Sequence, residues 1–186
     1  MIMDRNHALD LLNSRIKNPR ILAHSLASEV VMRRLASHFN EDVELWGLTG
    51  LLHDLDVEET EGNHELHANV AADFLKENGF PQIAVDAIRR HNERATQEPR
   101  TTLLDHALAA GETITGLITA TAMVYPDKRV DSVKPSSVVK RMKEKNFAAS
   151  VKRENILECE EIGIPMADFA EMSVEAMREI ADQIGL

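Results

Sequence analysis

The sequence contains a single cysteine and few aromatic residues. Cys159 has no partner for an intramolecular disulfide, which excludes a small secreted fold held together by disulfide bridges. Its neighbours Glu158, Glu160 and Glu161 disfavour a thiolate, so we interpret it as a reduced structural thiol. Aromatic residues make up 4% of the chain and hydrophobic residues 44%. The core of a single globular domain must therefore consist mainly of aliphatic side chains.

Positive charge is also scarce. The 186 residues include 21 Lys and Arg against 31 Asp and Glu, which gives a formal net charge of -10. This balance argues against general nucleic-acid binding, which normally uses a basic face. The N-terminus has acidic and polar residues where a signal peptide would need an apolar segment. Together with the reduced thiol, this predicts a cytoplasmic protein.

Long uncharged apolar segments are nearly absent. The closest is residues 106–125, where Glu112 is the only formally charged side chain. Its length is near the minimum for a membrane span, but it contains a central carboxylate, several threonines and two glycines. We therefore predict a buried core helix and no membrane segment. An ionised Glu112 in such a helix is costly unless it is paired or bound to a metal.

Period-two strand patterns and hairpin turns are absent, so the predicted class is all-α. Asn18 and Pro19 form a helix start, and apolar spacing from there to Phe39 puts His24 on the inward face. Further helices are predicted over residues 41–54, 65–78, 81–91 and 102–123.

Charge is strongly segregated along the chain. Residues 126–153 hold nine Lys and Arg against three acids, and residues 41–65 hold nine acids and no Lys or Arg. The simplest interpretation is two solvated faces. The alternative is that the basic segment lies over a site and attracts phosphate. We expect residues 1–125 to form the helical core, and residues 126–186 to pack on it as the basic segment and two or three short helices.

Six side chains that can bind a transition metal occur in predicted helices, most of them among apolar residues. Imidazole nitrogen and carboxylate oxygen are ordinary ligands of zinc, iron and manganese. Because His53 and Asp54 are adjacent at a helix end, both side chains can point toward one metal centre. A carboxylate has two oxygens, so Asp54 could bind one metal or two. The remaining histidines are interpreted as surface or core-edge residues: His7, His38, His64 and His106. The candidate ligands are His24, His53, Asp54, His67, His91 and Glu112.

The order of these residues resembles the HD-domain superfamily of metal-dependent phosphohydrolases. The stretch LLHDLD at residues 51–56 is similar to the family's LLHDIG sequence, and further likeness lies near His67, Gly79 and His91. The resemblance covers about residues 18–125 and implies an HD-like helical bundle. It also implies two metal sites. The first would be formed by His24, His53, Asp54 and Glu112, and the second would be completed by His67 and His91.

Three positions depart from the family pattern. The last ligand is usually aspartate, but here it is Glu112, for which the preceding Gly111 gives room. Asp56 replaces the usual glycine. Asn92 replaces the second histidine of a common pair, which argues against the cyclic-dinucleotide phosphodiesterase branch. Residues 133–186 resemble those of uncharacterised predicted HD hydrolases, which implies no substrate.

The resemblance implies hydrolysis of a small phosphoester, such as a nucleotide or related metabolite, by a metal-activated water. Asp54 would be the shared ligand and would accept the water's proton. Arg20, Lys140 and Arg141 would neutralise phosphate charge. One or two divalent transition metals per chain are expected, with Fe, Mn or Zn as first candidates and Mg or Co as others. Two alternatives stay open: a di-iron oxygenase with the same ligands, and a degenerate module that binds a nucleotide without turnover. The oligomeric state is not predicted.

Overall fold

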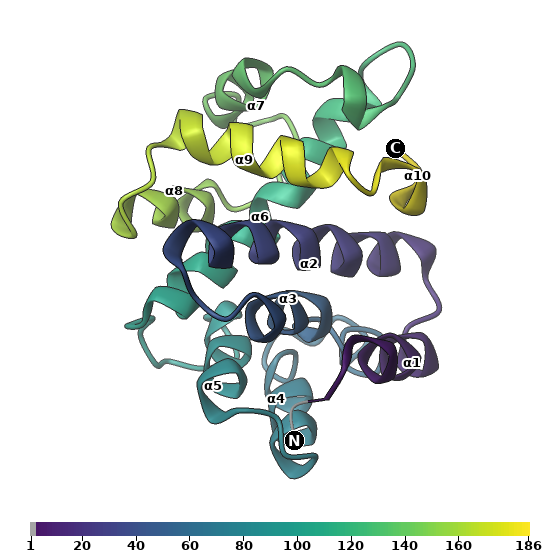
Figure 1. Cartoon of the computed structure of the whole chain (residues 1–186), viewed down its shortest axis with the longest axis vertical. Coiled ribbons are helices and arrows are strands. Elements are labelled where there is room, and N and C mark those ends of the chain that lie inside the picture. The colour runs from purple at the N-terminus through teal and green to yellow at the C-terminus, as the bar shows by residue number, and fades with distance from the viewer. Residues whose placement is uncertain (1–2) are drawn as a thin grey trace.

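The computed structural model describes residues 3–186, and every regular element in that range is a helix (Figure 1). This confirms the predicted all-α class. The elements are α1 (Arg5–Arg15), α2 (Pro19–Phe39), α3 (Val43–Leu52), α4 (Asn69–Glu77), α5 (Gln82–His91), α6 (Leu103–Met123), η1 (Val130–Ser132), α7 (Pro135–Met142), α8 (Arg153–Glu161), α9 (Met166–Arg178) and α10 (Ala181–Ile184).

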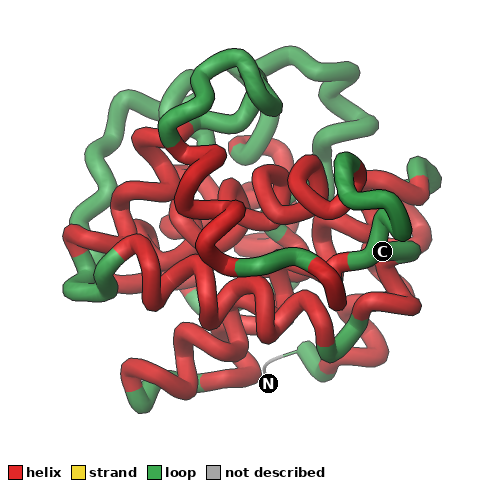
Figure 2. The backbone as a smooth tube through the Cα atoms, turned by 90° about the horizontal axis from the view of Figure 1, so that it is seen from above, coloured by secondary structure: helices red, strands yellow, loops and turns green. Residues whose placement is uncertain are grey.

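Two long helices, α2 and α6, form the centre of the molecule. In Figure 1, α2 crosses the middle, with α1, α3, α4 and α5 on one side and α7 to α10 on the other. Helix α2 packs against α3, α6 and α9, and α6 packs against α5 and α8. Figure 2, turned by 90°, shows that helices fill the interior and that most loops lie at the periphery. Residues from distant parts of the chain therefore meet around α2 and α6.

Local signals fix the N-terminal ends of both long helices. The side chain of Asn18 accepts a hydrogen bond from the amide of Arg20 at 2.9 Å, and Pro19 occupies the first turn of α2. Thr102 and Asp105 form a capping box at the start of α6. The predicted bounds of these two helices agree closely with the structure, because these caps are readable in the sequence.

Two glycines let neighbouring helices approach α2 closely. A Cβ at Gly50 of α3 would lie 2.7 Å from the carbonyl oxygen of Ser28. A Cβ at Gly111 of α6 would lie 3.0 Å from Sδ of Met32. Gly111 thus faces α2, and the expectation that it gives room to Glu112 is wrong. The missing side chain instead allows α6, and Glu112 with it, to lie close to α2.

Helix α1 is not predicted by the sequence pattern. Only Ala8 and Leu12 of this helix are buried, so its apolar stripe is weak. The helix packs on α3, and its Arg5 donates two hydrogen bonds to the buried carboxylate of Glu29 on α2, at 2.6 and 2.9 Å. A long-range ion pair of this kind leaves no local trace in the sequence.

The predicted helices at 41–54 and 65–78 are shorter in the structure. Helix α3 ends at Leu52 and α4 begins at Asn69, and turns connect them. Asp54 and His67 therefore lie on the turns. Helix α6 is buried over most of its length, as predicted for residues 106–125. Within residues 3–186, no helix is both long and apolar enough to cross a membrane.

Candidate metal centre

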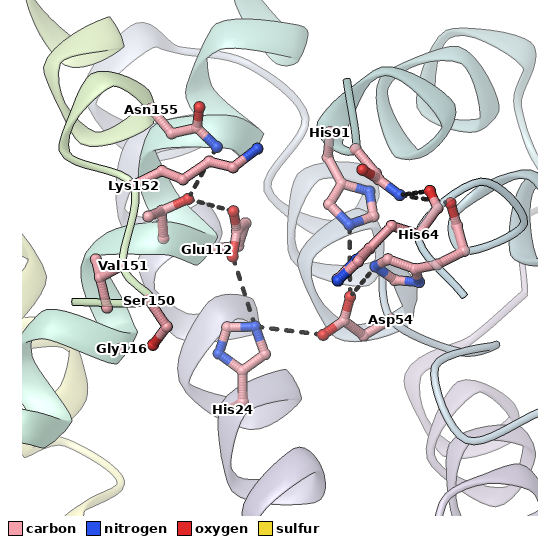
Figure 3. Close-up of a pocket in the computed structure, with 13 residues that line it drawn as sticks. His24, Asp54, His64, His91, Glu112, Gly116, Ser150, Val151, Lys152 and Asn155 are labelled. Carbon is pink, nitrogen blue, oxygen red and sulfur yellow. Dashed lines mark hydrogen bonds and ion pairs between the residues drawn. The ribbon is translucent and has the colours of Figure 1, made fainter. Parts of the chain in front are cut away.

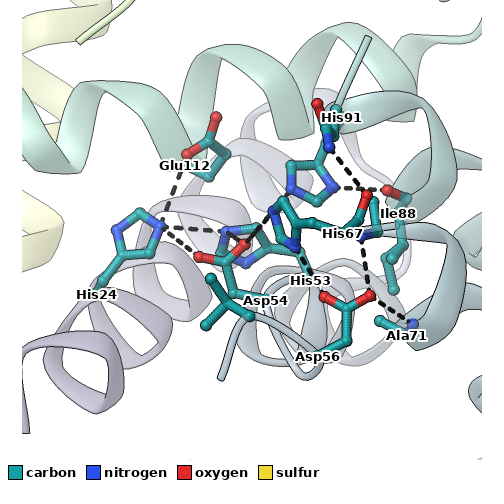
Figure 4. Close-up of polar contacts among 12 residues, drawn as sticks. His24, His53, Asp54, Asp56, His67, Ala71, Ile88, His91 and Glu112 are labelled. Atoms are coloured by element: carbon teal, nitrogen blue, oxygen red, sulfur yellow. Dashed lines mark hydrogen bonds and ion pairs between the residues drawn. The ribbon is translucent and has the colours of Figure 1, made fainter. Parts of the chain in front are cut away.

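Six predicted ligand residues come from five separate parts of the fold and point toward one another (Figure 4). They are His24 in α2, His53 and Asp54 at the end of α3, His67 before α4, His91 at the end of α5, and Glu112 in α6. His53 is fully buried and the other five are largely buried. The structure thus brings the whole predicted set together.

Asp54 lies at the centre of this cluster. Its Oδ1 is 3.3 Å from Nε2 of His53, 3.3 Å from Nε2 of His67 and 3.4 Å from Nε2 of His91. Its Oδ2 faces the opposite way and lies 3.5 Å from Nε2 of His24. The two oxygens of one carboxylate therefore serve two sides of the cluster.

Glu112 completes the side that contains His24. Its Oε2 lies 3.6 Å from Nε2 of His24, which is 3.1 Å from Nε2 of His53. Its Oε1 accepts a hydrogen bond from the hydroxyl of Thr113, which in turn lies 3.5 Å from the side-chain nitrogen of Asn155 on α8. The glutamate therefore points into the cluster.

His53 and His91 are oriented by the helices that they end. Nδ1 of His53 donates to the carbonyl of Gly50 at 2.8 Å, and Nδ1 of His91 donates to the carbonyl of Ile88 at 2.6 Å. Both carbonyls belong to the last turn of a helix, where carbonyl groups lack helical partners. In the neutral form of either ring, this hydrogen bond places the hydrogen on Nδ1 and leaves Nε2 without one, directed at Asp54.

His24 is oriented by α6. The hydroxyl of Thr115 donates to the carbonyl of Glu112 at 2.7 Å, so its oxygen must accept from Nδ1 of His24, 2.9 Å away. In its neutral form, this ring therefore also presents an unprotonated Nε2 to the cluster. Because Thr115 contacts both residues, it links the backbone at Glu112 to the ring of His24.

His67 is oriented by a buried carboxylate that sequence reasoning did not assign to the site. Nδ1 of His67 donates to Oδ1 of Asp56 at 2.7 Å, and Oδ2 of Asp56 accepts from the amides of Ala68 at 2.9 Å and Ala71 at 2.8 Å. A carboxylate behind a histidine is a common support of metal ligands. The sequence carries one sign of this role, because Asp56 stands where the family pattern usually has glycine.

The surroundings shift the pKa values of the cluster in different directions. Burial lowers the pKa of His53 to about 3, so this ring is neutral. Burial opposes ionisation of Asp54, but the surrounding histidines outweigh it and hold its pKa well below the ordinary value. Burial also raises the pKa of Glu112. For His67, burial acts downward, but the carboxylates of Asp54 and Asp56 prevail and raise the pKa to about 10.

These donors fit a cation. Four Nε2 atoms and two carboxylates face one small volume, and the facing Nε2 atoms of His24 and His53 are both acceptors in the neutral rings. Two groups each offer ligand atoms within 4.8 Å of one another: His24, His53 and Glu112, and His53, Asp54 and His91. A cation at His67 would take the place of the proton on Nε2, since metal ligands must be deprotonated.

The cluster opens into a polar cavity of about 390 Å³ (Figure 3). Its far wall comes from the segment before α8 and from α8 itself, including Ser150, Lys152 and Asn155. His64, interpreted from the sequence as an ordinary surface or core-edge residue, is exposed but also lines this cavity. No local pattern distinguishes His64, because its position depends on the turns that precede α4.

The three basic residues predicted to meet phosphate lie in different places. Arg20 lines a neighbouring cavity next to His24. Arg141 pairs with Glu144 at 2.6 Å and stacks over the ring of Phe147 at 4.0 Å. Neither Arg141 nor Lys140 is among the residues that line the polar cavity; from the same basic segment, Lys152 is.

Comparison with protein families identifies the HD domain over residues 21–122, which is more than half of the chain. The chain therefore belongs to the HD domain family, a superfamily of metal-dependent hydrolases whose members bind divalent metals. Searches of curated proteins and of solved structures gave no match.

Proposed function

We propose that the protein is a metal-dependent phosphohydrolase that cleaves a small phosphoester, such as a nucleotide or a related metabolite. The observation that supports this most is the arrangement of four histidine Nε2 atoms around Asp54, with every ring held through Nδ1. Mixed nitrogen and oxygen donors suit Fe, Mn and Zn, while Mg and Co are also candidates. The geometry is compatible with one or two metals.

In the one-metal arrangement, His24, His53, Asp54 and Glu112 would be the ligands. In the two-metal arrangement, His67 and His91 would hold a second cation, and Asp54 would be a ligand shared by both.

A bound metal of this kind supplies a water of lowered pKa and polarises a phosphoryl oxygen. Asp54 would accept a proton from the attacking water. Lys152 would neutralise phosphate charge in the cavity. Its ion pair with Glu93 at 2.5 Å is half-exposed and therefore weak enough to exchange for a phosphate.

The proposal is tested by elemental analysis of protein purified without chelators, followed by a screen of phosphoesters and nucleotides with Mn²⁺, Fe²⁺, Co²⁺ and Mg²⁺. We expect one or two metals per chain and release of phosphate. Asp54→Asn should abolish both. Asp10→Asn, an exposed change on α1, is the matched control and should alter neither.

The same screen separates the alternatives. An iron-selective protein that consumes oxygen and hydrolyses no ester would indicate a di-iron oxygenase. A protein that binds a nucleotide tightly without turnover, and binds no metal, would indicate a degenerate module. Either result would overturn the proposed hydrolase.

A further inference from the structure

A second and larger cavity adjoins the metal centre. It has a volume of about 590 Å³ and lies between the first turns of α2, the second half of α6 and the segment around α10. His24 and Gly116 line both this cavity and the polar one, so the two cavities are adjacent at these residues. A volume of this size is within the range of small-molecule sites.

The two cavities differ in chemistry. The polar cavity is lined by two carboxylates, four histidine side chains and a lysine. The described residues that line the second cavity are mainly aliphatic and include no carboxylate side chain, carboxamide or benzene-type ring: Pro19, Ala23, Met123, Ile184 and Leu186 carry most of the wall. Among these lining residues, the only Lys, Arg, Asp or Glu side chain is that of Arg20, which is exposed.

This lining favours a hydrocarbon over a nucleobase. A buried nucleobase leaves its polar edge unsatisfied unless amides, carboxylates or backbone groups pair with it, and it gains most from stacking on aromatic rings. An alkyl or aryl group needs neither, and it gains free energy from each methylene that leaves water.

We propose that the second cavity binds the hydrocarbon part of the substrate, so that the phosphate lies at the metal centre and an apolar alcohol portion extends past His24 and Gly116. This inference rests on the proposed phosphohydrolase function and narrows its substrate class to phosphoesters of apolar alcohols. Gly116 suits the boundary, because it lines both cavities and has no side chain that would extend into either of them.

The test measures binding to the metal-loaded protein by calorimetry and needs no turnover. The probes are ethyl-, butyl-, hexyl- and octylphosphonate, below their micelle concentrations, since their carbon–phosphorus bond is not hydrolysed as an ester. We expect affinity to rise about two- to fourfold per added methylene, as burial of apolar surface predicts.

Two neighbouring substitutions at the end of α6 form a matched pair. Met123 lines the second cavity and Val124 does not, and their exposed fractions are 49% and 56%. Met123→Asp should weaken octylphosphonate binding about tenfold and ethylphosphonate binding less than twofold, because a carboxylate opposes burial of the chain. Val124→Asp adds the same charge and should leave both affinities within twofold of the wild type.

The outcomes separate this inference from the proposed function. Affinity that does not depend on chain length, or that Met123→Asp and Val124→Asp change equally, would overturn the inference even if phosphoesters are hydrolysed. Binding of adenosine monophosphate that is tighter than that of octylphosphonate and is weakened by Met123→Asp would also overturn it. Chain-length dependence in a protein that hydrolyses no phosphoester would support the cavity and refute the hydrolase.

Discussion

Asp56 accepts a hydrogen bond from Nδ1 of His67 at 2.7 Å, and its second oxygen accepts two backbone amides at the start of α4. One buried carboxylate thus orients a candidate ligand and organises the turn that carries it. The turn includes Ala68, whose φ of 79° is unusual for a residue with a side chain. The hydrogen bonds from Ala68 and Ala71 help to hold this strained backbone.

We predict that Asp56→Asn lowers both metal content and stability. An amide has one acceptor oxygen in place of two, so it cannot serve His67 and both backbone amides together. The free energy of unfolding should fall by about 1–3 kcal/mol, as for other buried groups left without partners. Denaturant unfolding and elemental analysis measure the two effects, and Asp10→Asn is again the control. Full metal occupancy in Asp56→Asn would mean that the carboxylate does not support His67 as a ligand.

There is a physical reason why His24 and Glu112 could be assigned to the site from the sequence and Asp56 could not. Helical periodicity is sufficient to place His24 on an inward face, because residues one turn apart share a face. The burial of Glu112 follows instead from the absence of any other formal charge in residues 106–125. Asp56 could not be assigned in this way. Its partners are fixed by irregular turns over residues 53–68, whose path depends on tertiary contacts.

The basic segment shows the same limit. Its charge is evident from the sequence, but the lysine that lines the polar cavity is Lys152, whereas Lys140 and Arg141 were expected there. The choice depends on how the loop folds around Arg153. This guanidinium donates to the carbonyls of Ala148 at 2.7 Å and Val151 at 2.8 Å, and it also contacts the carbonyl of Phe147.

We therefore predict that Arg153→Lys loosens this loop without removing metal. A single ammonium cannot reproduce the planar set of donors that meets these carbonyls. Hydrogen–deuterium exchange of residues 143–152 should accelerate about tenfold, which corresponds to roughly 1.4 kcal/mol of local opening free energy. Lys145→Gln, an exposed change in the same loop, should leave the exchange unaltered. Unchanged protection in Arg153→Lys would show that other contacts hold the loop.

Cys159 provides a pH-dependent prediction away from the metal centre. Burial, with a further contribution from Glu160, raises the pKa of its thiol from about 9 to about 12. Well below pH 9 the thiol is protonated in both states. Between pH 9 and 12 the unfolded chain releases this proton and the folded chain does not, so rising pH favours unfolding.

The difference in unfolding free energy between wild type and Cys159→Ala isolates this effect, because other titrating groups are common to both. This difference should be constant from pH 7 to 8.5. Above pH 9, the unfolding free energy of the wild type should fall relative to that of Cys159→Ala by about 1 kcal/mol per pH unit. Thiol reagents should modify the folded wild type slowly at pH 8. Rapid modification, or a difference that is flat to pH 11, would contradict the buried neutral thiol.

The last prediction concerns the ligand position at which this chain departs from its family. Glu112→Gln should reduce metal affinity and leave the fold intact, because the amide keeps the shape and removes the charge. Glu112→Asp retains the charge but withdraws the carboxylate by one methylene from Nε2 of His24, which lies 3.6 Å from Oε2 in the wild type. It also loses the hydrogen bond from Thr113 that holds the other oxygen. Since Gly111 already lets α6 lie close to α2, the helix has little room to move inward and compensate.

Metal–oxygen distances near 2.0–2.2 Å tolerate only small errors, so Glu112→Asp should bind metal at least about tenfold more weakly. Competition with a metal-indicator dye measures this, and circular dichroism checks the fold. Stronger metal binding in Glu112→Asp, with phosphohydrolase activity that the wild type lacks, would instead identify the natural site as degenerate.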